Sequence, residues 1–324
     1  MSLTLAELFA SPDHYLHSFA DGAAVFVPMD RDAYRRSVFL DDRIDPAGNG
    51  AMRVPLGMLV GQAPAPRPIG WIFHVAHCGS TLLANALDAL GPNLVLREPL
   101  ALRQLGVARE VDDALMAVEL AMLGKAYDAD APTLVKANVP VNFVLNAIAA
   151  ARPDAPAIML YLGLEDYLCA ILRSANHRHW LRGVSAQLAH HLGPADGRSD
   201  AACAAALWQA QMTRFGAAMK AMPAARALDA EAFYADTFGT LLATALHFGM
   251  DVDTAAIAAL IAGPVFQTYS KRPGVAFSNA DRLERQAATR DSLAEEIEEA
   301  HQWLDGQGHD AEALARTLEE SSLR

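Results

Sequence analysis

The sequence has few of the residues that mark several common classes of protein. Its 324 residues include only three cysteines, Cys78, Cys169 and Cys203, and these are widely spaced. Such an odd and sparse set excludes a disulfide framework, shows no metal-ligand spacing and fits a reducing compartment. Residues 1–16 also lack the basic start of a signal peptide. We therefore expect a cytoplasmic protein without a bound metal.

Positive charge is scarce as well, because 26 Lys and Arg stand against 38 Asp and Glu and give a formal net charge of −12. A general binder of nucleic acid or of anionic membranes needs a positive surface field, so we expect neither partner. The longest uncharged run, 254–270, is broken by Gly263 and Pro264 and is too short to span a bilayer comfortably. A local cationic pocket for one small anion is compatible with this balance.

Apolar residues, by contrast, make up 52% of the chain, and between residues 69 and 173 strand-like runs alternate with helical patterns. Short apolar runs, typical of buried strands, stand at 69–75, 94–96, 133–136 and 157–162. Helical patterns follow them at 81–90, 111–127, 142–151 and from 166. This alternation predicts βαβ units, and so an α/β protein whose central parallel sheet is flanked by helices in three layers.

The organisation of the rest of the chain is simpler. Residues 1–66 are expected to form an N-terminal layer on the core, with a strand at 23–27 and a helix at 31–40. The α/β core then occupies 67–280, and from residue 200 its pattern is almost only helical, with one strand expected at 226–229. A charged helical segment, 281–324, completes what we expect to be one structural domain.

The most informative stretch is 71–83, in which a strand leads through a tight turn into a helix. Gly79 lets the backbone approach a phosphate closely, and the free N–H groups at the start of a helix favour an anion. The backbone of residues 78–81 is therefore expected to bind the anion. Ser80 and Thr81 either add hydroxyl donors or cap the helix, and the side chain of Cys78 is a small packing group. In a Walker A loop, His74 would be Gly and Ser80 would be Lys, which weighs against an ATPase or GTPase.

This stretch resembles the 5′-phosphosulfate loop of sulfotransferases, in which Pro, a basic residue, Ser, Gly and two Thr follow one another. Here residues 76–81 read Ala-His-Cys-Gly-Ser-Thr. Lys-Ala-Asn-Val-Pro at 136–140 is similar to the family's Lys-Thr-His-Leu-Pro segment. Residues 152–155 and 227–250 resemble further family segments, and 263–271 resembles a block of bacterial relatives. The resemblance spans about 68–285 and implies a P-loop-related fold with 3′-phosphoadenylyl sulfate as donor.

The chain departs from the family at positions that usually hold the donor. Leu162 and Ala170 stand where the family has an Arg and a Ser on the 3′-phosphate, and the substitutes available nearby are Arg173, Arg178 and Arg182. His77 replaces the basic loop residue, either as a pH-dependent cation or in a structural role. In many sulfotransferases a basic C-terminal segment closes over the donor. Its counterpart here, unless it is an ordinary exposed turn, comprises Ser270, Lys271 and Arg272.

Three polar residues follow or end the predicted strands and are candidates for the chemistry. Glu98 directly follows the second strand, at the edge where open α/β sheets place their sites, and is either a general base or a surface carboxylate that caps the next helix. Asn138 falls where cytosolic sulfotransferases have His, and its amide can orient an acceptor but cannot act as a base. Lys136 ends an apolar strand, so it either contacts the donor or Glu98, or reaches solvent at the strand edge.

Three functions remain open on this evidence. The first, which we expect, is transfer of a sulfuryl group from a phosphosulfate nucleotide to a hydroxyl or amine of a small molecule. The second is a non-catalytic nucleotide- or ligand-binding relative that has lost the 3′-phosphate contacts. The third is a P-loop phosphotransferase, disfavoured by the missing Walker Lys and the lack of a clear Asp for magnesium.

Overall fold

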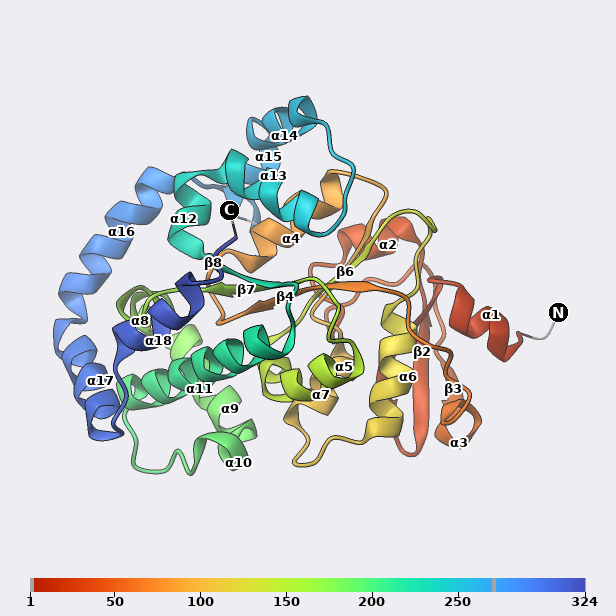
Figure 1. Cartoon of the computed structure of the whole chain (residues 1–324), viewed down its shortest axis with the longest axis horizontal. Coiled ribbons are helices and arrows are strands. Elements are labelled where there is room, and N and C mark those ends of the chain that lie inside the picture. Colours follow the sequence, from red (N-terminus) through yellow and green to blue (C-terminus); the bar gives the residue numbers. More distant parts are fainter. Residues whose placement is uncertain (1–2, 270–271, 324) are drawn as a thin grey trace.

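A five-stranded parallel sheet forms the middle layer of the molecule (Figure 1). The computed structural model describes residues 3–269 and 272–323. In chain order the strands are β4 (Ile69–His74), β5 (Leu94–Arg97), β6 (Thr133–Lys136), β7 (Ala157–Tyr161) and β8 (Ala225–Asp229). Their spatial order is β5–β6–β4–β7–β8, and every pair is parallel. The predicted α/β class is confirmed, and each predicted core strand is within one residue of its position.

The strand order determines where a ligand site can form. The chain leaves β4 toward β5, returns to β6 beside β4, and then crosses to β7 on the other side of β4. Connections on the two sides of β4 therefore diverge at its carboxyl end. In open α/β sheets such a switch in direction opens a crevice outside the carboxyl ends of the strands. The loop after β4 lies at this point.

Helices cover both faces of the sheet (Figure 1). One face carries α4 (Ser80–Ala89) and α13 (Thr237–His247), and the other carries α7 (Leu145–Ala151) and α11 (Asp200–Ala221). The 22-residue α11 is rich in Ala, and most of its residues are buried. Its small side chains let the neighbouring elements pack closely against it. Trp208 anchors it by donating its indole N–H to the carbonyl of Leu162 at 2.9 Å.

The remaining helices complete these layers and the two ends of the molecule. They are α1 (Leu5–Ala10), α2 (Arg31–Arg36), α3 (Leu56–Leu59), α5 (Leu100–Val107), α6 (Asp113–Leu123), the 3₁₀ helix η1 (Val139–Val144), α8 (Leu164–Leu172), α9 (Ala175–Gln187), α10 (Ala189–Leu192), α12 (Ala230–Ala235), α14 (Thr254–Ile261), α15 (Pro264–Gln267), α16 (Asn279–Ser292), α17 (Ala294–Gly306) and α18 (Ala311–Glu319). No helix in the described part of the chain is long and apolar enough to cross a membrane.

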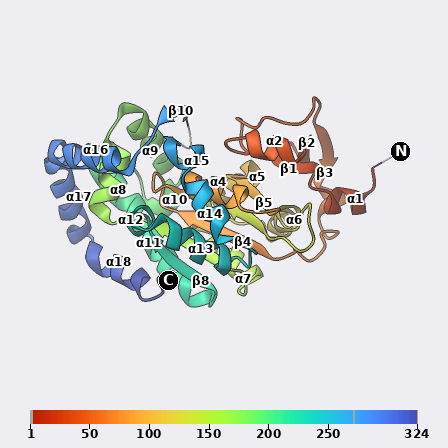
Figure 2. The ribbon, with the colours of Figure 1, turned by 90° about the horizontal axis from the view of Figure 1, so that it is seen from above.

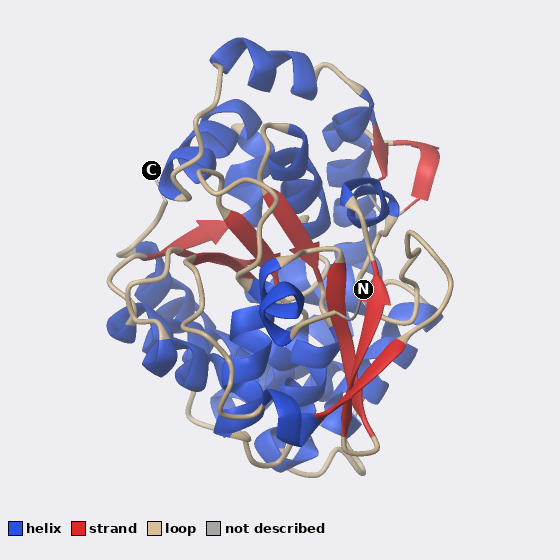
Figure 3. Cartoon of the chain, turned by 90° about the vertical axis from the view of Figure 1, so that its right-hand side faces the viewer, coloured by secondary structure: helices blue, strands red, loops and turns tan. Residues whose placement is uncertain are grey.

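The N-terminal layer is more extensive than the sequence analysis predicted. Beside the predicted strand, now β2 (Ala23–Pro28), it holds β1 (His14–Ala20) and β3 (Met52–Pro55) in an antiparallel sheet. Figure 3 faces this side of the molecule. The helix predicted at 31–40 ends at Arg36, because the following residues cross the end of β5. There Leu40 donates its N–H to the carbonyl of Arg97 at 2.7 Å.

The opposite end of the molecule is built by α16, α17 and α18, which wrap around the side of the core farthest from the N-terminal layer (Figure 2). A short antiparallel ribbon of β9 (Thr268–Tyr269) and β10 (Arg272–Ala276) precedes them and was missed in the sequence. The main hydrophobic core includes Tyr34 from the N-terminal layer and Leu304 and Leu318 from these last helices. All three predicted segments thus contribute to one core.

A buried pair of ionisable groups lies where the N-terminal layer packs on α6. Glu119 is fully buried, and burial raises the pKa of its carboxyl group to about 8. Lys125 is 5% exposed and donates its ammonium to the carbonyl of His14 at 2.6 Å. Burial lowers the pKa of Lys125 to about 7. Stability should therefore respond to pH through this pair.

We expect the free energy of unfolding to fall as the pH rises from about 5 to about 7, by at most about 1.4 kcal/mol per pH unit. In this range the folded state keeps a proton on Glu119 that the unfolded state releases, because its pKa is raised on folding. Urea unfolding of Glu119→Gln should lack this fall, since the amide stays neutral. The exposed Glu110→Gln is the matched control, and equal slopes in all three proteins would contradict the assignment.

Candidate functional site

Several residues with strained backbone conformations lie at the carboxyl edge of the sheet. Four non-glycine residues in the described chain have positive φ, and three lie here: Ala76 (78°), His77 (53°) and Glu98 (57°). The first two follow β4, and the third follows β5. Such conformations cost on the order of 1 kcal/mol or more each and persist where the surrounding structure holds them, often at functional sites. This edge of the sheet is therefore a candidate functional site.

The start of α4 presents free polar groups at this edge. Gly79 is its N-cap residue, with a left-handed φ of 83° and no side-chain capping bond, so neither Ser80 nor Thr81 caps the helix. Both hydroxyl residues are buried, at 4% and 2% exposure. The Thr81 Oγ1 atom has no hydrogen-bond partner among the described residues. A buried hydroxyl beside uncapped N–H groups is suited to an anion, which would satisfy both.

A tyrosine from a distant part of the chain lies against this helix start. The hydroxyl of Tyr234, on α12, is 2.6 Å from the position that a Cβ on Gly79 would take, so only glycine fits. Burial raises the pKa of Tyr234 to about 12, which keeps the phenol protonated and able to donate. The Arg282 guanidinium lies 4.1 Å from the centre of its ring and is held by two 2.7 Å bonds to Glu231. None of these residues was predicted as a site residue, although Glu231 and Tyr234 lie in the segment 227–250 that the sequence analysis compared with a family segment.

Aromatic rings from α9 cover the other flank of the loop. His77 stacks on His177, with ring centres 4.1 Å apart, and meets the edge of Trp180 at 5.6 Å. The Nδ1 atom of His177 in turn lies 2.9 Å from the carbonyl oxygen of Ala170. The imidazole of His77 is thus part of a packed aromatic group.

Glu98 and Lys136 are joined in an ion pair at the ends of β5 and β6. Lys136 is fully buried and donates its ammonium to Glu98 Oε1. His74 Nε2 lies 4.0 Å from the same oxygen, and the Glu98 N–H donates to the Lys136 carbonyl at 2.7 Å. The Phe39 ring, from the N-terminal layer, lies 5.3 Å from the ammonium. Lys136 therefore does not reach solvent.

The structure also tests whether Glu98 is a surface carboxylate that caps the next helix. Its side chain is 16% exposed, and the N-cap of α5 is Pro99 without any side-chain capping bond. Glu98 is thus neither a surface carboxylate nor a cap. The polar contacts that the Glu98 side chain makes with Lys136 and His74 both involve Oε1.

Asn138 lies on the next turn, between β6 and η1. It is 7% exposed, and its Oδ1 atom has no hydrogen-bond partner among the described residues. Below it, Asn142 donates to the carbonyl of His74 at 3.0 Å and to Gln211 Oε1 at 2.8 Å. The structure therefore places Asn138 at the same edge as Glu98 and Lys136, with a free acceptor atom.

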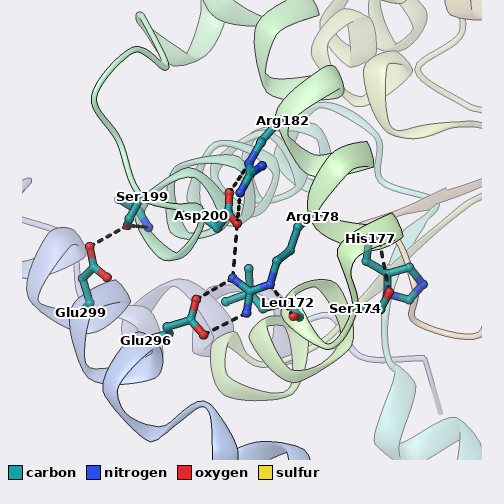
Figure 4. A network of polar contacts seen from close by, with 10 residues as sticks. Leu172, Ser174, His177, Arg178, Arg182, Ser199, Asp200, Glu296 and Glu299 are labelled. Atoms are coloured by element: carbon teal, nitrogen blue, oxygen red, sulfur yellow. Dashed lines mark hydrogen bonds and ion pairs between the residues drawn. The ribbon is translucent and has the colours of Figure 1, made fainter.

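The arginines proposed as substitutes for the missing 3′-phosphate contacts are engaged elsewhere (Figure 4). Arg178 makes two bonds to Glu296, at 2.6 and 2.9 Å, and one to Asp200. Arg182 makes two 2.7 Å bonds to the same Asp200. These carboxylates raise the pKa of Arg178 further above its usual value. Arg173 contacts His177 at 3.3 Å. Arg178 and Arg182 thus tie α9 to α11 and α17.

Other candidate residues are less completely placed. Ser270 and Lys271 lie outside the described residues, and Arg272 begins β10, opposite Tyr269. The end of this ribbon is near the site, because the ring of Phe277 lies 6.2 Å from that of Tyr234. Cys78 is buried, with its sulfur 3.8 Å from the Leu160 carbonyl. Within the described ranges, no cluster of His, Cys, Asp or Glu could hold a metal ion.

No protein-family model matches this sequence, and no curated protein matches it. Among solved structures, the chain is similar to the sulfotransferase domain from the curacin biosynthetic pathway, with a TM-score of 0.42 and 11% identity over 74% of this chain and 98% of that one. It is also similar to a sulfotransferase from Alicyclobacillus acidocaldarius, with a TM-score of 0.38 and 14% identity over 77% of this chain and 99% of that one. At these identities the likeness concerns the fold alone.

Proposed function

We propose that this protein binds the phosphosulfate group of a nucleotide donor, 3′-phosphoadenylyl sulfate, at the start of α4 and transfers the sulfuryl group to a hydroxyl or amine of a small molecule. The observation that carries the proposal is the arrangement at the carboxyl edge. The buried Thr81 hydroxyl at the uncapped start of α4 has no hydrogen-bond partner among the described residues, and this helix start adjoins the loop after β4. His74, at the end of β4, lies beside the Glu98–Lys136 pair. Anion binding and proton acceptance are thus available on neighbouring strands.

The phosphosulfate end of the donor fits the groups present. The N–H groups at the start of α4 and the Thr81 hydroxyl would bind its oxygens, and the Tyr234 phenol, close to Gly79, is a further donor. The 3′-phosphate end fits less well. Leu162 is buried and apolar, and the side chains of Arg178 and Arg182 are held by carboxylates. Affinity should therefore come mainly from the phosphosulfate.

The reaction then assigns a separate task to each residue. The acceptor oxygen or nitrogen forms a bond to sulfur, the bond between sulfur and the bridging phosphate oxygen breaks, and the acceptor proton passes to Glu98 Oε2. The charge left on the donor phosphate is stabilised by the α4 N-terminus. Lys136 orients Glu98 through Oε1, and Asn138 Oδ1 can accept a hydrogen bond from the acceptor.

A second function is favoured by two observations. Lys136 and Glu98 satisfy each other without a ligand, and the family's 3′-phosphate residues are absent at Leu162 and Ala170. A non-catalytic protein that binds the anion and performs no transfer would show the same arrangement. Turnover, measured as labelled sulfate appearing on an acceptor, separates the two functions.

Thr81→Val should weaken binding of adenosine 3′,5′-bisphosphate by about tenfold, because a charge-assisted hydrogen bond is lost. The thermal midpoint should stay the same or rise, since the hydroxyl has no partner among the described residues. Titration calorimetry and thermal unfolding measure the two effects. Substituting Gly79 is a poorer test, because a Cβ there would displace the Tyr234 hydroxyl.

Thr133→Val is the matched control for this experiment. Its buried hydroxyl donates to the Lys125 carbonyl at 2.6 Å, at the opposite end of the sheet. This variant should be less stable but should bind the nucleotide normally. Unchanged nucleotide affinity in Thr81→Val would remove the α4 start from the binding site.

Glu98→Gln should lower turnover by about a hundredfold or more, the usual effect of losing a general base, with little change in donor affinity. It should also destabilise the fold by several kcal/mol, because it leaves the buried Lys136 without its carboxylate. The double variant Glu98→Gln/Lys136→Met should regain stability but not turnover. Sulfuryl transfer and urea unfolding measure these effects.

Asn138→Ala provides the comparison within the same site. A loss of turnover confined to this variant would move the chemistry from Glu98 to the end of β6. Full activity in Glu98→Gln would reject the mechanism. Nucleotide binding without turnover of any hydroxyl or amine acceptor would favour the non-catalytic function.

A further inference from the structure

A second concave site lies at the opposite end of the sheet from the loop after β4. It has a volume of about 680 Å³, within the range of small-molecule pockets. Its walls come from α1, from the segment that enters β4 and from the end of α6. Arg67 stands two residues before β4 begins, and Lys125 follows the end of α6 on the way to β6. Both residues therefore lie at the amino edge of the sheet, whereas Glu98 lies at the carboxyl edge.

The pocket is mainly apolar and has a fixed floor. The floor includes Ala121 and Gly124, which are buried. A Cβ on Gly124 would lie 2.9 Å from the backbone nitrogen of Arg67, so the absence of a side chain lets the two segments meet. The apolar lining on either side comprises Leu5, Ala6, Phe9 and Ala10 from α1, and Pro64 and Ala65 from the entry segment. Such walls suit an apolar chain.

The charge of the lining is opposite to that of the whole protein. Arg67 is its fully charged residue, since burial lowers the pKa of Lys125 to about 7, and no carboxylate is among the described residues that line it, although the chain carries a net charge of −12. Arg67 is exposed at the mouth of the pocket, and its Nη2 donates a hydrogen bond to the carbonyl of Ala129 at 2.7 Å. Burial raises the pKa of the nearby Glu119 to about 8, so this carboxyl is mostly protonated at neutral pH and does not cancel the positive potential.

We propose that this pocket binds a small amphipathic anion, a carboxylate that carries an unbranched apolar chain. The chain lies between α1 and the entry segment, over Ala121, and the carboxylate meets the Arg67 guanidinium at the mouth. Charge complementarity selects the anion over a neutral molecule with the same chain. The site is separate from the one at the carboxyl edge and does not depend on the function proposed for it.

Titration calorimetry of the full chain with decanoate and with decan-1-ol tests the proposal. Decanoate should bind saturably and more tightly than the alcohol. Arg67→Met should lower decanoate affinity by about tenfold and leave the alcohol unchanged, because only the charged contact is removed. The exposed Arg109→Met, outside the lining, is the matched control and should bind as the unmodified protein does.

Two further variants test the location. Ala121→Phe fills the floor, and Ala65→Trp narrows the pocket from an exposed wall without entering the core. Each should reduce binding of both ligands at least tenfold. Thr81→Val should leave decanoate binding intact, since it lies at the other edge. The proposal is overturned if decanoate does not bind saturably, if Arg67→Met and Arg109→Met behave alike, or if both pocket-filling variants bind normally.

Discussion

The pairing of Lys136 with Glu98 is the interaction on which the arrangement of the site depends. A fully buried ammonium needs a carboxylate close by, because an unpaired charge in the core costs several kcal/mol. Glu98 supplies it from the neighbouring strand, with its backbone in a left-handed conformation at φ 57°. The chain after α2 then crosses the end of β5 and places the Phe39 ring beside the ammonium. One buried charge thus connects the N-terminal layer, two strands and the candidate base.

The rest of the carboxyl edge is assembled from segments far apart in the sequence. Tyr234 reaches Gly79 from α12, and His177 and Trp180 reach His77 from α9. The helices that carry or support these residues are held by ion pairs, Arg282 with Glu231 and Arg178 with Glu296. Bidentate contacts of this kind are directional, so they fix positions more than they add stability. The C-terminal helices α16 and α17 thereby hold the helices of the site in position through these ion pairs.

Local pattern was a sufficient guide where the chain is buried on both sides. The strand β7, at 157–161, is fully buried and was predicted to within one residue, since a central parallel strand is apolar along its whole length. The helix predicted at 31–40 was too long, because hydrogen bonds between Leu40 and the β5 end compete with helix continuation after Arg36. The strands β1 and β3 were missed, because buried and more exposed residues do not alternate regularly along either strand. In β1 the pairing with β2 also shifts register between Leu16 and Ser18.

By itself the sequence determined the α/β class, the five core strands and the strand–Gly–helix turn at Gly79, because these features depend on residues close together in the chain. It also singled out Glu98, Lys136 and Asn138, each of which ends or follows a strand. The tertiary structure alone decided that Lys136 is buried against Glu98, that Tyr234 and Arg282 lie at the loop and that Arg178 is held by Glu296. These contacts join residues 38 to more than 100 positions apart. Such pairings arise from the order of the strands and the packing of the helices on the sheet, which no local pattern encodes.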